Sequence, residues 1–270
     1  MNNGIVLKKS VRIALWISLL FAFIISVGFT DSRQANMKCS ELMISVNDST
    51  GQSFVEARDI RQIILDKFGE IEGQTLSNIN ISLLEKIIDN NPFVADAEVF
   101  SSVNGKLNIE VTQRKPVVRV FNIKQESFYI DDQGEFMPLS EKYTARVPVA
   151  NGFIPEQESD INLLIKKEFN SPDTTGKKSA ISRVYAIADF LNRNDFWNAQ
   201  IEQIYINASG EIELIPRVGL HTIIIGNTEG LQEKFDRLYT FYNDGLNKTG
   251  WNKYSTINLK FKDQVVCTKK

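Results

Sequence analysis

The sequence predicts an α+β protein with an N-terminal transmembrane helix, a compact β-α-α-β-β unit and a mainly antiparallel β-domain with two or three helices. Three observations support this prediction. Residues 13–29 are uncharged and apolar, residues 41–121 switch between strand and helix periodicity, and residues 122–267 hold several strand-turn-strand patterns. The other segments are predicted to be a cytoplasmic tail (1–12), a linker (30–40) and a C-terminal tail (268–270).

The composition excludes some classes of protein. The chain has 270 residues, of which 43% are hydrophobic and 24% charged, close to the average for globular proteins. The formal net charge is −2 and the basic residues are scattered, so nucleic acid is not a predicted partner.

The apolar run Ile13–Phe29 is long enough to act as a membrane anchor. As a helix it spans roughly 26 Å, slightly less than the hydrocarbon core of about 30 Å. Lys8, Lys9 and Arg12 precede it, whereas charges of both signs follow it, so the N-terminus is predicted in the cytoplasm. A cleaved signal peptide is the alternative, because small residues at Ser26–Gly28 could form a cleavage site. The length of the run favours the retained anchor, and both alternatives export the rest of the chain.

The first exported unit begins with a strand and two helices. Residues 42–46 alternate as in a half-buried strand, and a helix is predicted from about 55 to 68, before Gly69. A second helix begins at Asn80 or Ser82, with Ser82 and Glu85 spaced as in a capping box.

A hairpin completes this unit. Alternating residues lie on both sides of Asn104-Gly105, and both residues suit the positive φ angles that a tight hairpin turn requires. The predicted order is therefore β-α-α-β-β.

The second exported unit is predicted to be mainly β. Phe128–Ile130 is followed by the turn 132–134 and a return strand. The other predicted elements are a helix at 181–191, strands at 201–206, 212–215 and 219–226, and a helix from about Glu229.

The cysteines and the single histidine offer little chemistry. Cys39 and Cys267 are far apart in the sequence, and we predict that both are free. His221 lies in a strand-like stretch and is predicted to be an ordinary strand residue. These counts cannot build a His/Cys zinc site, and no metal or cofactor is predicted.

Several motifs of the first unit resemble one family. Residues 91–99, 105–111 and 113–120 resemble the POTRA domain of the FtsQ/DivIB bacterial cell-division proteins, including its Arg114-Lys115-Pro116 junction motif. Gln113 stands where the family usually has Glu. Without this resemblance, the junction motif would indicate only a strand that ends at a proline.

The second unit extends the resemblance. Residues 128–136 look like the family's tyrosine-aspartate-glycine signature, and Val147–Gly152 resembles a proline-glycine stretch of the same family. Residues 257–267 resemble its C-terminal ending, with Lys260 in the basic position and Phe261 in the aromatic one. Asn258 replaces the usual Asp.

The resemblance implies a non-catalytic scaffold without cofactors or a small-molecule substrate. Proteins of this family span the inner membrane once, carry their C-terminal region in the periplasm and act at the division septum. They bind FtsB- and FtsL-type bitopic proteins and link them to septal cell-wall synthesis. Their last strands accept a strand from the partner, which is β-augmentation. On this basis the predicted partner-binding residues are Phe261, Lys262, Asp263, Gln264, Val265 and Val266.

Three alternatives compete with this interpretation. The last strand could be an ordinary one whose edge is protected by Lys260, Lys262, Lys269 and Lys270. The chain could be an exported POTRA-type chaperone or transport-associated module, although such proteins usually carry tandem POTRA units and a barrel. It could also be a periplasmic enzyme using Asp131-Asp132, but adjacent carboxylates on a turn are usually solvated turn formers and no catalytic motif accompanies them.

Overall fold

The computed structural model describes residues 16–21, 37–47, 53–169 and 178–270. Residues 16–21 are helical. The predicted cytoplasmic tail and the rest of the predicted transmembrane segment lie outside the described residues. Among the described residues there is no helix with the length and apolar character needed to cross a membrane.

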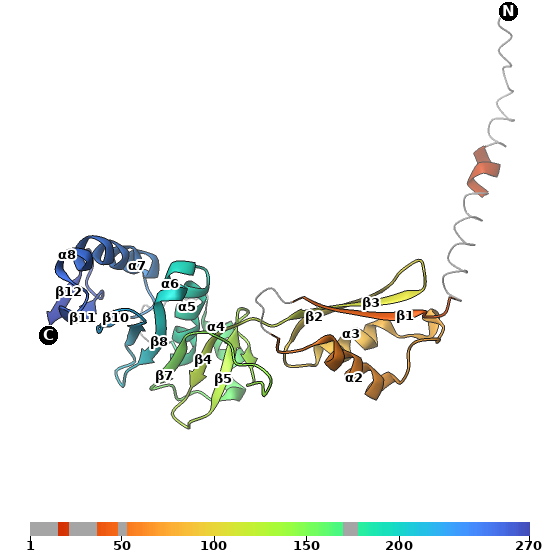
Figure 1. Cartoon of the computed structure of the whole chain (residues 1–270), viewed down its shortest axis with the longest axis horizontal. Helices are drawn as coiled ribbons and strands as arrows, with labels where there is room; N and C mark the ends of the chain where they lie inside the picture. The colour runs from red at the N-terminus through yellow and green to blue at the C-terminus, as the bar shows by residue number, and fades with distance from the viewer. Residues whose placement is uncertain (1–15, 22–36, 48–52, 170–177) are drawn as a thin grey trace, which may run out of the picture. The chain divides into compact units, whose positions relative to one another are not determined.

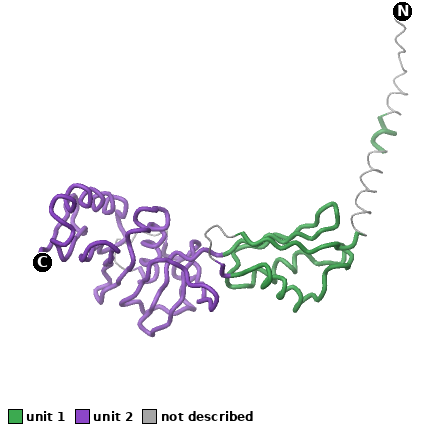
Figure 2. The backbone as a smooth tube through the Cα atoms, in the orientation of Figure 1, with its two compact units in different colours: residues 1–51, 55–113 green, residues 52–54, 114–270 purple. Residues whose placement is uncertain are grey.

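The chain forms two compact units (Figure 2). Unit 1 comprises residues 1–51 and 55–113, and unit 2 comprises residues 52–54 and 114–270. We predict a boundary at residue 121, but residues 116–121 form a strand of the unit 2 sheet. The boundary differs because this strand is hydrogen-bonded to strands on both sides within unit 2.

Unit 1 has the predicted β-α-α-β-β order, with one additional 3-10 turn (Figure 1). Its three-stranded sheet has the order β1-β3-β2, in which β3 is parallel to β1 and antiparallel to β2. The elements are β1 (Glu41–Asn47), α2 (Ala57–Phe68), η1 (Leu76–Asn78), α3 (Ile81–Asp89), β2 (Val94–Ser101) and β3 (Lys106–Gln113).

The cap of α3 differs from the predicted capping box. Asn80 is the N-cap, and its side-chain oxygen accepts a hydrogen bond from the Leu83 N–H at 3.0 Å. Glu85 does not cap the helix, because its carboxylate accepts from the Val99 N–H of β2 at 3.0 Å. Glu85 therefore ties α3 to the sheet.

The core of unit 1 lies between its two helices and one face of the sheet. Alternate residues of β3 point into it, as the period of a strand requires. The residues with no exposed surface are Ile60, Leu84, Ile88, Leu107, Ile109 and Val111.

Unit 2 is a nine-stranded sheet with helices packed against it. The strand order is β12-β11-β10-β9-β8-β7-β4-β5-β6. The strands are β4 (Pro116–Phe121), β5 (Ser127–Asp131), β6 (Phe136–Met137), β7 (Val149–Gly152), β8 (Ile201–Ile206), β9 (Ile212–Pro216), β10 (Thr222–Gly226), β11 (Tyr254–Asn258) and β12 (Val266–Lys269). The helical segments are η2 (Glu158–Asp160), α4 (Ile161–Glu168), α5 (Ala180–Asn192), α6 (Asp195–Gln200), α7 (Leu231–Thr240), the π-helix η3 (Phe241–Leu246) and α8 (Asn247–Thr249).

The sheet is mainly antiparallel, as predicted, because five of its eight strand pairs among the described residues are antiparallel, but three pairs are parallel. β7 is parallel to both β4 and β8, and β10 is parallel to β11. Parallel neighbours need a crossover connection, usually helical. Here α4, α5 and α6 lie between β7 and β8 in the chain, and α7 to α8 lie between β10 and β11. The helices therefore outnumber the predicted two or three.

Aromatic side chains pack the helices of unit 2 against one another. Phe190 of α5 stacks on Phe235 of α7 with ring centroids 4.6 Å apart, and Trp197 of α6 contacts Phe235 at 5.0 Å. Strands β8, β9 and β10 alternate between fully buried and partly exposed residues, so the helices cover one face of this sheet. This packing fixes the C-terminal strands at one edge.

Candidate functional site

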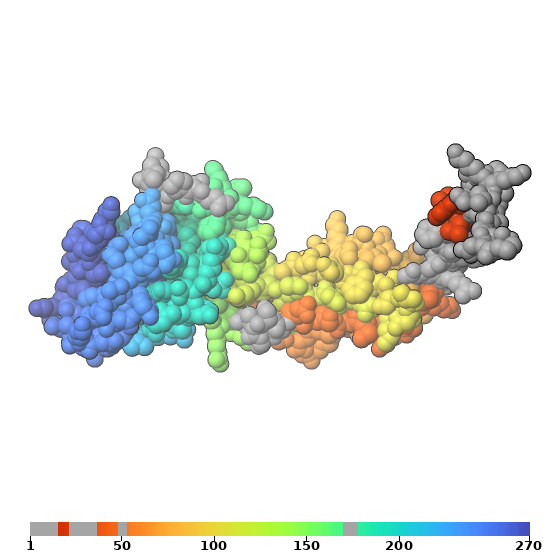
Figure 3. Space-filling view, turned by 90° about the horizontal axis from the view of Figure 1, so that it is seen from above, coloured from red at the N-terminus to blue at the C-terminus, as the bar shows by residue number. Residues whose placement is uncertain are grey.

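The last strand, β12, is an open edge of the unit 2 sheet. Among the described residues it pairs with β11 on one side only, and the opposite edge is the two-residue β6. Val266 is 42% exposed, and Thr268 and Lys269 are also exposed, whereas Cys267 packs against the core. Figure 3 shows these last residues, in dark blue, on the surface of the unit.

Main-chain groups of β12 face this open side. The Lys270 N–H donates to the Lys253 carbonyl, and the Thr268 carbonyl accepts from the Ser255 hydroxyl, so both residues turn toward β11. Because alternate residues of a strand direct their N–H and C=O groups to opposite sides, those of Cys267 and Lys269 face outward. An extended chain could pair with them.

The stretch predicted to bind a partner is not one continuous strand. Residues 261–263 form a turn, Gln264 and Val265 precede the strand, and only Val266 belongs to β12. Asp263 has a φ of 59°, in the left-handed region, which interrupts extended backbone. Partner binding by these residues stays a prediction.

Arg237 of α7 holds the turn in place. Its guanidinium donates to the carbonyl of Leu259 at 3.1 Å and lies 3.5 Å from the carbonyl of Phe261. The Phe261 ring stays 46% exposed. The turn lines part of two hollows of about 570 and 450 Å³. The larger hollow is lined by Asp236, Arg237, Thr240, Phe241, Asp244, Gly245, Asp263, Gln264 and Val265.

Lys234 lines the smaller hollow as a buried cation. Its side chain is 8% exposed, and its ammonium donates to the carbonyl and the side-chain oxygen of Asn227 at 2.9 and 2.8 Å. No carboxylate forms an ion pair with it among the described residues. Burial is the main cause that lowers the pKa of Lys234 to about 8; the nearby Arg237 acts in the same direction and Glu229 acts against it.

This buried ammonium predicts an unusual pH dependence of stability. The pKa of Lys234 is about 8 in the folded state, below its ordinary value of 10.5, so the unfolded chain binds more protons between these pH values. The free energy of unfolding should therefore rise as pH increases from about 8 to about 10.5. Urea unfolding of wild type and Lys234→Met across this range measures it. If the difference between the two proteins does not change with pH, the lysine is not buried as a cation.

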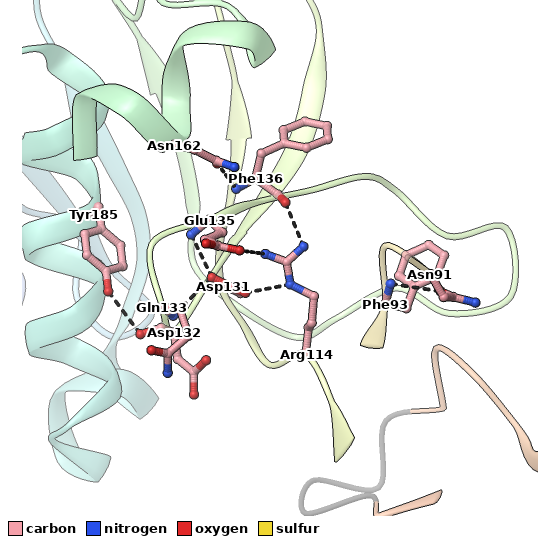
Figure 4. Close-up of polar contacts among 10 residues, drawn as sticks. All are labelled: Asn91, Phe93, Arg114, Asp131, Asp132, Gln133, Glu135, Phe136, Asn162 and Tyr185. Atoms are coloured by element: carbon pink, nitrogen blue, oxygen red, sulfur yellow. Dashed lines mark hydrogen bonds and ion pairs between the residues drawn. The ribbon is translucent and has the colours of Figure 1, made fainter. Parts of the chain in front are cut away.

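The junction motif forms a polar network at the start of unit 2 (Figure 4). Arg114 donates to the Asp131 carboxylate at 2.7 Å, to the Phe136 carbonyl at 3.0 Å and to the Glu135 carboxylate at 3.2 Å. The side chains of Arg114 and Asp131 are only 12% and 3% exposed. The carbonyl of Lys115 accepts from the Asp132 N–H at 2.9 Å. The motif therefore fastens β4 to the β5–β6 turn.

The same network occupies both carboxylate oxygens of Asp131. One of its oxygens is bound to Arg114, and the other accepts from the N–H groups of Gln133 and Glu135. Burial and the neighbouring Asp131 raise the pKa of Asp132. Because both oxygens of Asp131 hold the turn, we assign this residue a structural role. Among the described residues no group of three or more His, Cys, Asp or Glu side chains could hold a metal ion.

The single histidine and the two cysteines are the remaining candidate site residues. His221 is buried beside β10, and its Nε2 lies 2.9 Å from the Tyr242 hydroxyl. Cys39 and Cys267 are free thiols. Sequence reasoning missed Thr268 and Lys269 as strand residues and took them as a tail. It also missed Arg237, whose place on an amphipathic helix carries no signal of the turn it supports.

Comparison with known proteins agrees with this architecture. A model of a POTRA-like domain matches residues 37–112. The model "FtsQ/DivIB, C-terminal related" matches residues 115–268, more than half of the chain. The chain belongs to the FtsQ/DivIB family. It is also 26% identical, over 211 residues, to the cell division protein FtsQ of Geotalea daltonii, which covers 77% of this chain and 70% of that protein.

Membership of the FtsQ/DivIB family confirms the resemblance drawn from the sequence motifs. The two matches meet at residues 112–115, where the structure divides into its two units. The second match includes the turn before β12 and β12 itself as far as Thr268. The open edge is therefore part of the family's own domain.

Proposed function

We propose that this FtsQ/DivIB protein is a non-catalytic, membrane-anchored scaffold of the bacterial division apparatus. It recruits FtsB- and FtsL-type bitopic proteins by strand addition at β12 and links them to septal wall synthesis. It spans the inner membrane once at residues 13–29, with its C-terminal units in the periplasm, and acts at the septum.

The observation that supports this proposal best is the unpaired side of β12. An edge strand offers a ready template for another strand, because its outward N–H and C=O groups lack partners in the sheet. Lysines that normally protect edges are present, but the exposed side chain of Val266 gives an incoming strand an apolar contact. Main-chain pairing would supply affinity, and alternate side chains would supply specificity.

A proline at Lys269 tests strand addition directly. Lys269→Pro removes one outward N–H, whereas Lys269→Ala removes only the charged side chain. A photo-crosslinker at Val266 in cells reports capture of the partner. We expect Lys269→Pro to lower the capture of a small bitopic protein about tenfold relative to Lys269→Ala, because a hydrogen bond is lost and the ring blocks approach. Equal capture by both variants, or no capture of a bitopic protein by the unmodified edge, would falsify strand addition here.

A further inference from the structure

A cluster of basic and apolar side chains lies at one end of the unit 2 sheet, beside the open edge. Three segments meet there: the β9–β10 loop (217–221), the α8–β11 segment (247–253) and the end of β12. They meet because β11 runs parallel to β10, which brings Thr256 beside Thr222, and β12 returns antiparallel, which brings Lys269 beside Tyr254. In Figure 1, α8 and the end of the chain lie at this same end of the unit.

The charged side chains of this cluster, which we call the basic tip, are all basic. The three segments contain no Asp or Glu. All five cations are exposed, and none forms an ion pair among the described residues; Lys253 instead lies over the ring of Tyr254. The cations of the basic tip are Arg217, Lys248, Lys253, Lys269 and Lys270.

Edge protection does not explain the basic tip. Lysines protect an edge when they lie on the edge strand, but Arg217 and Lys253 lie in loops beside inner strands and Lys248 lies in the short helix α8. The β9–β10 loop also exposes two large apolar side chains. Leu220 is 72% exposed and Val218 is 49% exposed, next to the partly buried Trp251. Exposed aliphatic groups surrounded by unpaired cations indicate a binding surface for an acidic, amphipathic chain.

The distance between the open edge at β12 and the basic tip limits which chain could bind the tip. A strand added to β12 would lie three strand spacings from β10, about 14 Å at about 4.8 Å per spacing. An extended chain covers about 3.3 Å per residue, so about five residues lead from the added strand to Leu220. The segment that flanks the added strand can therefore reach the basic tip without leaving the surface of unit 2.

We propose that the basic tip binds the acidic segment that flanks the partner's added strand, with an apolar residue of that segment placed on Leu220 and Val218. This inference rests on the proposed strand addition at β12. It adds a second contact that would fix the direction and register of the partner strand, which main-chain pairing alone leaves open. Arg217, Lys248 and Lys253 would attract the acidic flank, and their loss would weaken capture more at low salt than at high salt.

Crosslinking from two positions of the full chain in cells tests this proposal. A photo-crosslinker at Val266 identifies the chain on the edge, and one at Leu220 identifies the chain on the tip, with the crosslinked peptides mapped by mass spectrometry. We expect the same bitopic protein at both positions, with the Leu220 peptide within about ten residues of the edge strand and richer in Asp and Glu than in Lys and Arg.

Charge-reversal variants measure how much the cations of the basic tip contribute to capture of the partner. Lys248→Glu with Lys253→Glu should lower capture at Val266 on the order of tenfold, whereas Lys166→Glu with Lys167→Glu, which reverses two exposed charges on α4, should not change it. If Val266 captures the partner but Leu220 captures lipid, glycan, another protein or nothing, the tip inference fails and strand addition stands. If Val266 captures nothing, both fail together.

Discussion

Replacing Gly152 by alanine is expected to destabilise unit 2 by at least about 3 kcal/mol more than the same change at Gly250. Gly152 has a φ of +101°, and a Cβ there would lie 2.1 Å from the carbonyl oxygen of Ile206. This backbone cannot easily move, because the Phe153 N–H donates to the same oxygen at 2.7 Å. The substitution should therefore push β7 away from β8 in the middle of the sheet.

Gly250 is the matched control for backbone strain. Its φ is +94°, close to that of Gly152, but a Cβ there would meet nothing within 4 Å. Alanine at Gly250 should cost about 1 kcal/mol from backbone conformation alone. Urea unfolding of the detergent-solubilised full chain, followed by tryptophan fluorescence to which the buried Trp197 contributes, measures both variants. Equal losses would show that β7 and β8 can separate without cost.

Replacing Arg114 by alanine is expected to lower the free energy of unfolding of unit 2 by about 3–5 kcal/mol. The change leaves the carboxylate of Asp131, which is 3% exposed, buried without its cation. It also leaves the Phe136 carbonyl without its donor. The β5–β6 turn should loosen first, because Asp131 accepts the hydrogen bonds that close it.

Arg119→Ala is the control for losing an arginine from β4. Arg119 donates to the neutral Ser127 hydroxyl at 3.1 Å and lies 4.9 Å from the centre of the Phe121 ring. Its removal leaves no buried charge, so we expect a loss of about 1 kcal/mol. The same unfolding experiment compares the two variants. If Arg119→Ala costs as much as Arg114→Ala, the buried ion pair is not what makes the junction motif important.

Local patterns were enough for unit 1. The alternation before residue 47, the helical spacing around Ile60 and Leu84, and the Asn104-Gly105 turn each act over a few residues, and the structure has these elements in the predicted order. Asn80, one of the two predicted starts of α3, is its N-cap, but the predicted capping box of Ser82 and Glu85 does not form. Whether Glu85 bonds to its own helix or to Val99 depends on where β2 lies, and no local pattern contains that.

Unit 2 was less predictable because its sheet depends on long-range pairing. β7 is four residues long and lies between β4 and β8 in the sheet. In the chain, β5 and β6 separate it from β4, and the helices α4 to α6 separate it from β8. A short strand of this kind has little periodicity of its own, so its parallel pairs became apparent only in the folded sheet. The helix α4 was also missed, because only two of its eight residues are buried and so its apolar periodicity is weak.

The sequence by itself determined the class of fold, the order of the first unit and, through short motifs, the family. These features depend on neighbouring residues, whose periodicity and turn chemistry are written in the chain. Only the tertiary structure decided that Arg114 pairs with Asp131, that Arg237 supports the turn before β12, and that three separate segments form the basic tip. Such contacts join residues far apart in the sequence, so they exist only once strand order and helix packing have brought them together.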